Sequence, residues 1–352
     1  MTQTITIDPV TRLEGHGKIT IMLNDQGEVT DAHFHVTQVR GFEKFSEGRP
    51  FYEMPSLMAR ICGICPVSHL LASAKACEDI MSVRIPHTAA QLRRMLNLAQ
   101  MVQSHALSFF HLSSPDLLLG MESDPAKRHI FGVAAARPDL GLAGIGLRRF
   151  GQHIIELLGT KRIHTGWVVP GGVTEPLTSS RRDEILAMLP EAYANIALAL
   201  TAYKQIADSF SQEISVFANF PSNYLGLINE DESFEITDGA LRLIDPQGAI
   251  IEDGMNASRF TEQIGEADEN FSYTKFVYYK ALGYPEGSYR VGPLARLNIV
   301  KSMGTPQADK ELALFKQISV GPVESSFHYH HARLVEALYG IEKIEQILAE
   351  RR

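Results

Sequence analysis

The chain has 352 residues, of which 45% are hydrophobic and 21% are charged, a balance typical of a soluble globular protein with enough apolar side chains for a sizeable core. Its formal net charge of -8 argues against nucleic acid as a partner, because phosphate binding requires clustered Lys and Arg side chains. No run approaches the roughly 18 apolar residues of a membrane helix, and three cysteines, an odd number, do not suit a disulfide framework, so we expect a cytoplasmic protein without a membrane span.

The first 40 residues alternate between polar and apolar positions, which is the period of a β-strand. Residues 18–23 and 29–36 flank Asn24-Asp25-Gln26-Gly27, and this pattern predicts a β-hairpin. From Pro66 to Met81 the apolar residues recur at helical spacing instead, with Pro66 at a first-turn position where its missing N–H costs nothing.

Longer helical patterns follow in the rest of the chain. Apolar spacing predicts a helix over about 88–112 and another over about 181–214, in which Pro190 is expected to cause a kink or a break. A second small strand pair is expected around residues 245–248, and a last helix over about 325–350. These elements predict an α+β protein that is predominantly α, with a large helical bundle core and peripheral β-hairpins.

We expect a single domain over residues 1–352, with a β-rich part at 1–45 and a mainly helical part at 46–352. The sequence shows no internal repeat, no low-complexity segment and no obvious linker. Its last helical pattern runs to Arg352 without a Gly or another terminator. This ending leads us to expect a chain truncated at its C-terminus.

The segment with the most chemistry is Arg60-Ile61-Cys62-Gly63-Ile64-Cys65-Pro66-Val67-Ser68-His69. Two thiols three positions apart at a loop-to-helix junction can point at one metal, and the helix N-terminus is expected to lower their pKa. Thiolates suit nickel, iron, copper(I) and zinc. The pair by itself also fits a thioredoxin-like dithiol, although no βαβ pattern surrounds it, or two buried bystanders. Zinc would need two further ligands, and no second close cysteine pair provides them.

Two other polar segments precede this motif. Asp8-Pro9-Val10-Thr11-Arg12-Leu13-Glu14-Gly15-His16-Gly17 places an acid, a guanidinium and an imidazole in a turn between strands. Taken alone, it reads most simply as a polar loop with capping functions. Arg40-Gly41-Phe42-Glu43 offers one carboxylate, which could be an ordinary surface charge.

Together and in this order, the three segments resemble the large (catalytic) subunits of nickel–iron hydrogenases. That family carries an Arg-x-Glu-Gly-His element, an Arg-Gly-x-Glu element, and Arg-x-Cys-Gly-x-Cys followed by a His. The resemblance covers essentially the whole chain and is closest to the soluble NAD-reducing branch. It continues through Ser104-His105, His111, Asp116, Pro170-Gly171-Gly172 and Val291-Gly292-Pro293-Leu294-Ala295-Arg296.

The resemblance implies a nickel–iron centre whose iron carries CN and CO ligands. By match, Cys62 is a terminal nickel ligand, and Cys65 is a thiolate that bridges nickel and iron. His69 is implied to donate a hydrogen bond to the Cys65 sulfur and so to orient and tune that ligand. Glu14 matches the carboxylate that collects the proton when hydrogen is split.

The other matched positions are implied to support this centre. Glu43 matches a ligand of a buried magnesium, a cation that prefers oxygen donors. Arg60 and Asp116 match polar residues near the metals, and His16 is expected to hold its turn in place. Cys77, which has no counterpart in the motif, is best interpreted as a small buried hydrophobe.

The implied activity is reversible heterolytic cleavage of H2. Electrons would leave through iron–sulfur clusters in a partner small subunit, because three cysteines cannot supply the usual four ligands of even one cluster. NAD and FMN would bind to diaphorase subunits, since the chain contains no Gly-x-Gly-x-x-Gly fingerprint.

The family pattern also ends with an Asp-Pro-Cys-x-x-Cys-x-x-His element, which this sequence lacks. No cysteine follows Cys77, and no histidine follows His331. Three explanations remain: a truncated chain, one piece of a split protein, or a metal-free scaffold related to the quinone-module subunit of respiratory complex I. Because Cys62 and Cys65 are both kept, we favour truncation and expect the chain alone to be inactive.

Overall fold

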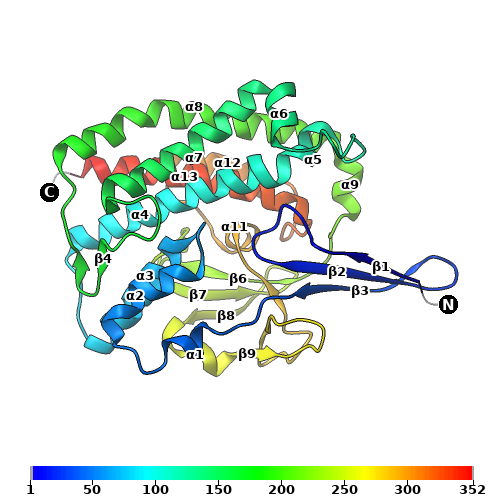
Figure 1. The fold of residues 1–352 in the computed structure, drawn as a ribbon, viewed down its shortest axis with the longest axis horizontal. Coiled ribbons are helices and arrows are strands. Elements are labelled where there is room, and N and C mark those ends of the chain that lie inside the picture. Colours follow the sequence, from blue (N-terminus) through cyan, green and yellow to red (C-terminus); the bar gives the residue numbers. More distant parts are fainter. Residues whose placement is uncertain (1–2, 351–352) are drawn as a thin grey trace.

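The computed structural model describes residues 3–350, and a three-stranded antiparallel sheet forms its N-terminal part. Its strands pair in the order β1-β2-β3, and they extend to one side of the molecule (Figure 1). The Asn24 side-chain oxygen accepts the backbone N–H of Gln26 at 3.0 Å and closes the turn between β2 and β3. The predicted hairpin is therefore confirmed. The strands are β1 (Gln3–Ile7), β2 (Gly17–Leu23) and β3 (Val29–Val36).

Four long helices form a bundle that makes up one layer of the molecule (Figure 1). Helix α4 packs between α7 and α13, and α8 contacts both α7 and α13 from the other side. Their facing sides supply most of the main apolar core, so the predicted helical bundle is confirmed. The helices are α4 (His87–Ala106), α7 (Pro138–Gly159), α8 (Ser179–Ser209) and α13 (Tyr329–Ala349).

Glycines on α7 allow this helix to lie very close to α4 and the turn after it. A Cβ at Gly151 would lie 2.2 Å from the carbonyl oxygen of Ala99 and 2.8 Å from the Cβ of Gln103. At Gly144 it would lie 2.5 Å from the ring of Phe110. A side chain at either position would push the two helices apart.

The chain remains helical after the last α-helical residue of α4. It continues through a π-helical segment, Leu107–Ser113, into α5 (Ser114–Leu119). The wider turn is supported by the Ser113 hydroxyl, which donates to the Ser108 carbonyl at 3.0 Å. The predicted helix over 88–112 thus contains a π-helical part, a feature that is frequent at functional sites.

Two predicted helices differ from the structure in detail. Pro190 lies inside α8 without interrupting it, on an exposed side where water can bond the carbonyl that a proline leaves free. The expected break is therefore absent, and α8 is followed by a separate short helix, α9 (Ser211–Val216). The last helix begins with a 3-10 turn, Ser326–His328, which Ser325 caps by accepting the Phe327 N–H.

A second sheet lies beneath the bundle, on the opposite side from α8 (Figure 1). It has the order β11-β6-β7-β8, and the turn at residues 245–248 joins β7 and β8, as predicted from the sequence. Beside it lies the pair β9 and β10. The strands are β6 (Asn223–Ile228), β7 (Ala240–Ile244), β8 (Ile250–Met255), β9 (Ile264–Ala267), β10 (Phe276–Tyr279) and β11 (Tyr289–Arg290).

Helix α3 (Pro66–Met81) has the bounds predicted from the sequence and leads out of the cysteine motif. The remaining elements are shorter and connect the layers. They are α1 (Phe42–Ser46), α2 (Met54–Met58), α6 (Ile130–Ala136), α10 (Phe260–Gln263), α11 (Pro293–Ile299), α12 (Pro306–Lys316), β4 (Val168–Val169), β5 (Gly172–Val173) and the 3-10 turns Phe51–Glu53, Ala59–Ile61 and Ala257–Arg259.

Within the described residues, α8 is long and apolar enough to cross a membrane by length and composition alone, a feature not expected from the sequence. In the fold this helix packs against α7 and α13. A helix in the core of a soluble protein would pass the same test, so this feature is weak evidence for a membrane span.

Candidate metal centre

The two cysteines of the motif lie on a short loop between a 3-10 turn and α3. Cys62 follows the turn Ala59–Ile61, and Cys65 is the residue before the first residue of α3. The backbone N–H of Cys65 donates to the Cys62 sulfur at 3.2 Å, so the loop curls around that sulfur. Both side chains are partly buried and neither forms a disulfide, which leaves two free thiols facing one another.

His69 completes a compact group of metal-binding atoms. It lies one helical turn after Cys65, and its Nε2 atom lies 3.7 Å from the Cys65 sulfur. The potential ligand atoms of Cys62, Cys65 and His69 all lie within 4.8 Å of one another. Across residues 3–350 no other group of three such side chains is as close.

The N-terminal loop brings a carboxylate to this group. The Cys62 thiol lies 3.9 Å from Oε1 of Glu14, a residue 48 positions earlier in the chain. The loop is closed at its base by the Val10 N–H, which donates to the Gly17 carbonyl at 3.0 Å. The structure therefore places the predicted acid beside the predicted thiolates.

Arg12 fastens the same loop to the π-helical segment. Its guanidinium donates to the Leu112 carbonyl at 2.8 Å. It also forms an ion pair with the Asp116 carboxylate through two contacts of 2.8 and 2.7 Å. The Arg128 guanidinium also lies 3.3 Å from Oδ1 of Asp116. Asp116 thus contacts the Glu14 loop through Arg12, and it has no hydrogen bond to either cysteine.

Two other predicted site residues, Arg60 and His16, do not belong to the group of potential metal ligands. The Arg60 side chain is exposed and makes no hydrogen bond or ion pair within residues 3–350. His16 is also exposed, and its backbone carbonyl, which accepts the Thr37 N–H at 3.2 Å, braces the turn. Neither side chain forms a hydrogen bond with a cysteine.

Glu43 lies on α1, apart from the cysteines. Its carboxylate is exposed and pairs with Arg40, whose guanidinium also contacts Glu266 at 3.1 Å. A backbone hydrogen bond, together with this ion pair, holds the pKa of Glu43 below its usual value. A single carboxylate neutralised by an arginine does not make an oxygen-rich cation site, so the residues present do not fit a magnesium ion.

The ionisation of the Cys65 thiol differs from the expectation. Burial, followed by the neighbouring Cys62 and the negative charge of Glu14, raises the pKa of Cys65 to about 12. The prediction that the helix N-terminus lowers the pKa is wrong for Cys65, because these effects outweigh the helix dipole. Burial also lowers the pKa of His69 and favours its neutral form, which is the form that binds metals.

The donor set has a clear chemical preference. Two sulfurs and an imidazole are soft or intermediate ligands that suit nickel, iron, copper(I) or zinc. A metal would bind the thiolate forms and displace the protons, so the raised pKa of Cys65 implies proton release on binding. The residues present therefore fit a nickel–iron group, of which they supply two thiolates.

Two glutamines on α4 contact the cysteine loop, and neither was predicted from the sequence. Gln100 accepts the backbone N–H groups of Val67 and Ser68, and Gln103 donates to the Ile64 carbonyl at 3.0 Å. A glutamine within a helix is ordinary in composition. Only their burial could have drawn attention to them, because both lie on the apolar side of the predicted helix.

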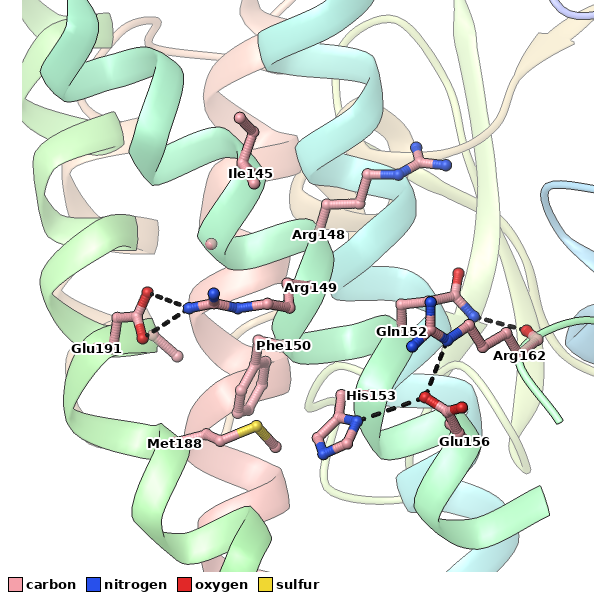
Figure 2. A pocket seen from close by; sticks show the side chains of 12 residues that line it. Ile145, Arg148, Arg149, Phe150, Gln152, His153, Glu156, Arg162, Met188 and Glu191 are labelled. Atoms are coloured by element: carbon pink, nitrogen blue, oxygen red, sulfur yellow. Dashed lines mark hydrogen bonds and ion pairs between the residues drawn. The ribbon is translucent and has the colours of Figure 1, made fainter. Parts of the chain in front are cut away.

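A surface groove of about 620 Å³ lies between α7 and α8 (Figure 2). Its polar side chains are mostly paired with one another: Arg149 with Glu191 at 2.9 Å, and Glu156 with Arg162 at 2.9 Å. Gln152 and Arg162 line both this groove and a small cavity behind the cysteine loop. The residues that line the groove include no cysteine and no close group of metal ligands.

Comparison with known proteins gives consistent matches. Residues 4–39 match a family described as HoxL-like, and residues 40–128 match the nickel-dependent hydrogenase family. A vhu-type F420-non-reducing hydrogenase polypeptide of Methanocaldococcus jannaschii is 40% identical over 346 residues, which are 98% of this chain and 82% of that protein. The NAD-reducing hydrogenase HoxS subunit beta of Cupriavidus necator is 37% identical over 361 residues, covering 99% of this chain and 74% of that protein.

Solved structures agree in fold. A crystal structure of an NAD+-reducing NiFe hydrogenase in the H2-reduced state superposes with a TM-score of 0.97 at 40% identity, over 99% of this chain and 78% of that one. A NiFeSe hydrogenase from Dm. baculatum matches with a TM-score of 0.78 at 22% identity, over 99% of this chain and 79% of that one, which is a likeness of fold alone.

Proposed function

The chain belongs to the nickel-dependent hydrogenase family, as a large-subunit member, and we propose that it catalyses the reversible heterolytic cleavage of H2 as the subunit that holds the nickel–iron centre. The observation that carries this proposal is the gathering of Cys62, Cys65 and His69 within 4.8 Å, with the Glu14 carboxylate 3.9 Å from the Cys62 sulfur. The metal-free scaffold related to complex I would require neither thiolates nor a carboxylate at this place.

When bound, a nickel–iron centre with CN and CO ligands supplies the position at which H2 is polarised and split. Cys62 and Cys65 hold it as thiolates, and His69 directs its Nε2 atom at the Cys65 sulfur to orient that ligand. Glu14 accepts the proton at Oε1, next to the Cys62 sulfur. Arg12 keeps the Glu14 loop against the π-helical segment while the proton moves.

The electron route lies in other subunits. Three cysteines cannot hold an iron–sulfur cluster with the usual four thiolates, so we propose a small subunit that carries such clusters. By likeness to the NAD-reducing relatives, diaphorase subunits with FMN would pass the electrons to NAD in the cytoplasm. The likeness to F420-non-reducing relatives at 40% identity supports a second candidate, a different acceptor protein in place of the diaphorase.

Replacing Glu14 by Gln tests the acid directly. We expect hydrogen turnover in the assembled enzyme to fall by about 10² to 10⁴-fold, because the amide cannot accept the proton. The nickel content should remain that of the wild type, since Glu14 holds no metal. Glu53→Gln, the same change on an exposed residue of the turn before α2, is the matched control and should keep full activity. A Glu14→Gln enzyme with wild-type turnover would contradict the proposed acid.

The polypeptide of residues 1–352 without partners should retain no stoichiometric nickel. Two thiolates are half of the four that the resemblance implies for this centre, so a metal held by them alone would be under-coordinated. Elemental analysis and a hydrogen-uptake assay of the purified chain measure this. Stoichiometric nickel with hydrogen-dependent NAD reduction would refute the expectation, and zinc without nickel would favour a zinc-binding interaction module.

A further inference from the structure

Helix α3 begins without a capping side chain of its own. Cys65, the residue before the helix, makes no side-chain cap, and Pro66 has no N–H to satisfy. The first backbone donors that need a partner are therefore those of Val67 and Ser68. Both point to the side-chain oxygen of Gln100, at 2.7 and 3.2 Å, while the Ser68 N–H also reaches the Cys65 carbonyl at 3.2 Å.

Gln103 holds the loop itself. It lies one turn after Gln100 on α4, and its amide nitrogen donates to the carbonyl of Ile64, the residue between Gly63 and Cys65, at 3.0 Å. Gln100 and Gln103 are 5% and 3% exposed, so each amide is fixed by packing and has little freedom to choose another partner. The two side chains thus form hydrogen bonds on both sides of Cys65: Gln103 with the loop before it, and Gln100 with the start of α3 after it.

The position of these amides is fixed from behind by α7. The backbone of α7 at Gly151 lies so close to Gln103 that a Cβ at Gly151 would be 2.8 Å from the Gln103 Cβ. This close packing prevents α4 from moving away from the cysteine loop. The Gln103 side-chain oxygen is buried and has no hydrogen-bond partner among the described residues, which costs free energy of desolvation. The Gln103 nitrogen nevertheless keeps its hydrogen bond to Ile64. This arrangement fixes the backbone on which both sulfurs are carried.

We propose that Gln100 and Gln103 are positioning residues that set the geometry of the Cys62–Cys65 metal loop. The inference rests on the proposed function of the two cysteines as metal ligands. Residues that orient the ligands of a metal site typically change metal affinity about 10 to 100-fold when they are removed. The two glutamines orient the ligands by bonding the backbone of the loop, and they make no hydrogen bond to the sulfurs.

The two amides act through different atoms, and this difference supplies the test. The Gln100 oxygen accepts both backbone N–H groups, and its amide nitrogen donates to the Ser68 hydroxyl at 2.5 Å. Gln100→Glu keeps the accepting oxygen, the Ser68 hydroxyl can donate to the new carboxylate, and a negative charge at a helix N-terminus is favourable. Gln103 acts as a donor, so Gln103→Glu loses the bond and sets a carboxylate against a carbonyl. Met is close in shape to both and removes the hydrogen bonds. Gln152, which lines the same small cavity but donates to the Arg162 carbonyl, gives the matched control Gln152→Met.

Cobalt(II) serves as the probe, because its binding to thiolates produces a charge-transfer absorption band. In the purified chain titrated with excess Co(II), Cys62, Cys65 and His69 can bind the ion more weakly than a complete centre would. We expect Gln103→Met, Gln103→Glu and Gln100→Met to weaken this affinity about 10-fold or more. Gln100→Glu and Gln152→Met should bind like the wild type. A set in which both Glu variants behave alike, or in which Gln152→Met weakens binding as much as Gln103→Met, would overturn the inference.

Hydrogen exchange measured without metal separates this inference from the proposed function. Gln100→Met should speed exchange at the amides of Val67 and Ser68 about 10-fold or more, and Gln103→Met should speed exchange at Cys65. Unchanged exchange would overturn the positioning role. If the wild-type chain bound no Co(II) through its thiols, the metal function of the cysteines would fail, while the exchange rates would still decide whether the glutamines fix the loop.

Discussion

Replacing Cys62 or Cys65 by Ser is expected to abolish hydrogen turnover in the assembled enzyme. A serine hydroxyl is nearly the same size as a thiol, but it stays protonated and is a hard donor, so it cannot replace a thiolate that nickel or iron prefers. The loss should exceed that of Glu14→Gln, because the metal ligand itself disappears. Hydrogen-dependent reduction of a redox dye measures the effect independently of the natural acceptor.

Cys77→Ser is the matched control for this prediction. Cys77 is buried on α3, where its thiol donates to the Phe51 carbonyl at 3.1 Å, a bond that a hydroxyl can also make. Its replacement should leave turnover close to that of the wild type. A metal-free scaffold would behave differently, since all three substitutions would then leave its function and assembly unchanged.

Replacing Glu336 by Ala is expected to destabilise the fold by about 3 to 5 kcal/mol, the usual penalty for breaking a buried ion pair. Glu336 of α13 is fully buried and accepts two hydrogen bonds of 2.7 Å from Arg296 and one of 2.7 Å from His105. Burial alone would raise its pKa, but Arg296 and His105 outweigh burial and lower the pKa to about 2. The carboxylate is therefore charged at neutral pH.

Without this carboxylate, the partly buried positive charges of Arg296 and Arg333 would remain unpaired. Burial lowers the pKa of His105 to about 4, so His105 is neutral and cannot exchange roles with the arginine. Arg296 and the neighbouring Arg333, which contacts His105 at 3.1 Å, would then lack their only buried counter-charge in this cluster of described residues. The same carboxylate joins α4, α11 and α13, so its removal loosens three elements of the bundle.

Urea unfolding of the purified chain measures this effect as a shift of the midpoint. Glu191→Ala is the matched control, because Glu191 forms an exposed ion pair with Arg149 at 2.9 Å, and such pairs contribute at most about 1 kcal/mol. If both substitutions shifted the midpoint equally, the buried cluster would not have the stabilising function assigned to it.

Much of the fold could be predicted from residue spacing. The bounds of α3 follow from its apolar period and Pro66, and the hairpin of β2 and β3 follows from the turn at Asn24. Pro190 shows the limit of such rules, because an exposed proline can remain inside a long helix. The π-helical segment after α4 was not predictable either, since it depends on serine hydroxyls that bond backbone carbonyls within the folded helix.

The sequence predicted the main residues of the candidate site, but not the residues that hold the cysteine loop in position. The motif order indicated Glu14, Cys62 and Cys65, and the fold brings Glu14 and Cys62 together from positions 48 residues apart. Local spacing gave no sign of Gln100 and Gln103, whose partners lie on another helix and its preceding loop. The pKa of Cys65 was predicted in the wrong direction, because burial and the Glu14 charge exist only in the folded chain.

Nickel K-edge X-ray absorption of the assembled enzyme tests most directly whether these two sulfurs bind the metal. The wild type and Cys77→Ser are expected to show nickel with a sulfur-rich shell, whereas Cys62→Ser should show less nickel or fewer sulfur neighbours per nickel. An oxygen- and nitrogen-only shell in the wild type, or an unchanged sulfur shell and nickel content in Cys62→Ser, would contradict the account.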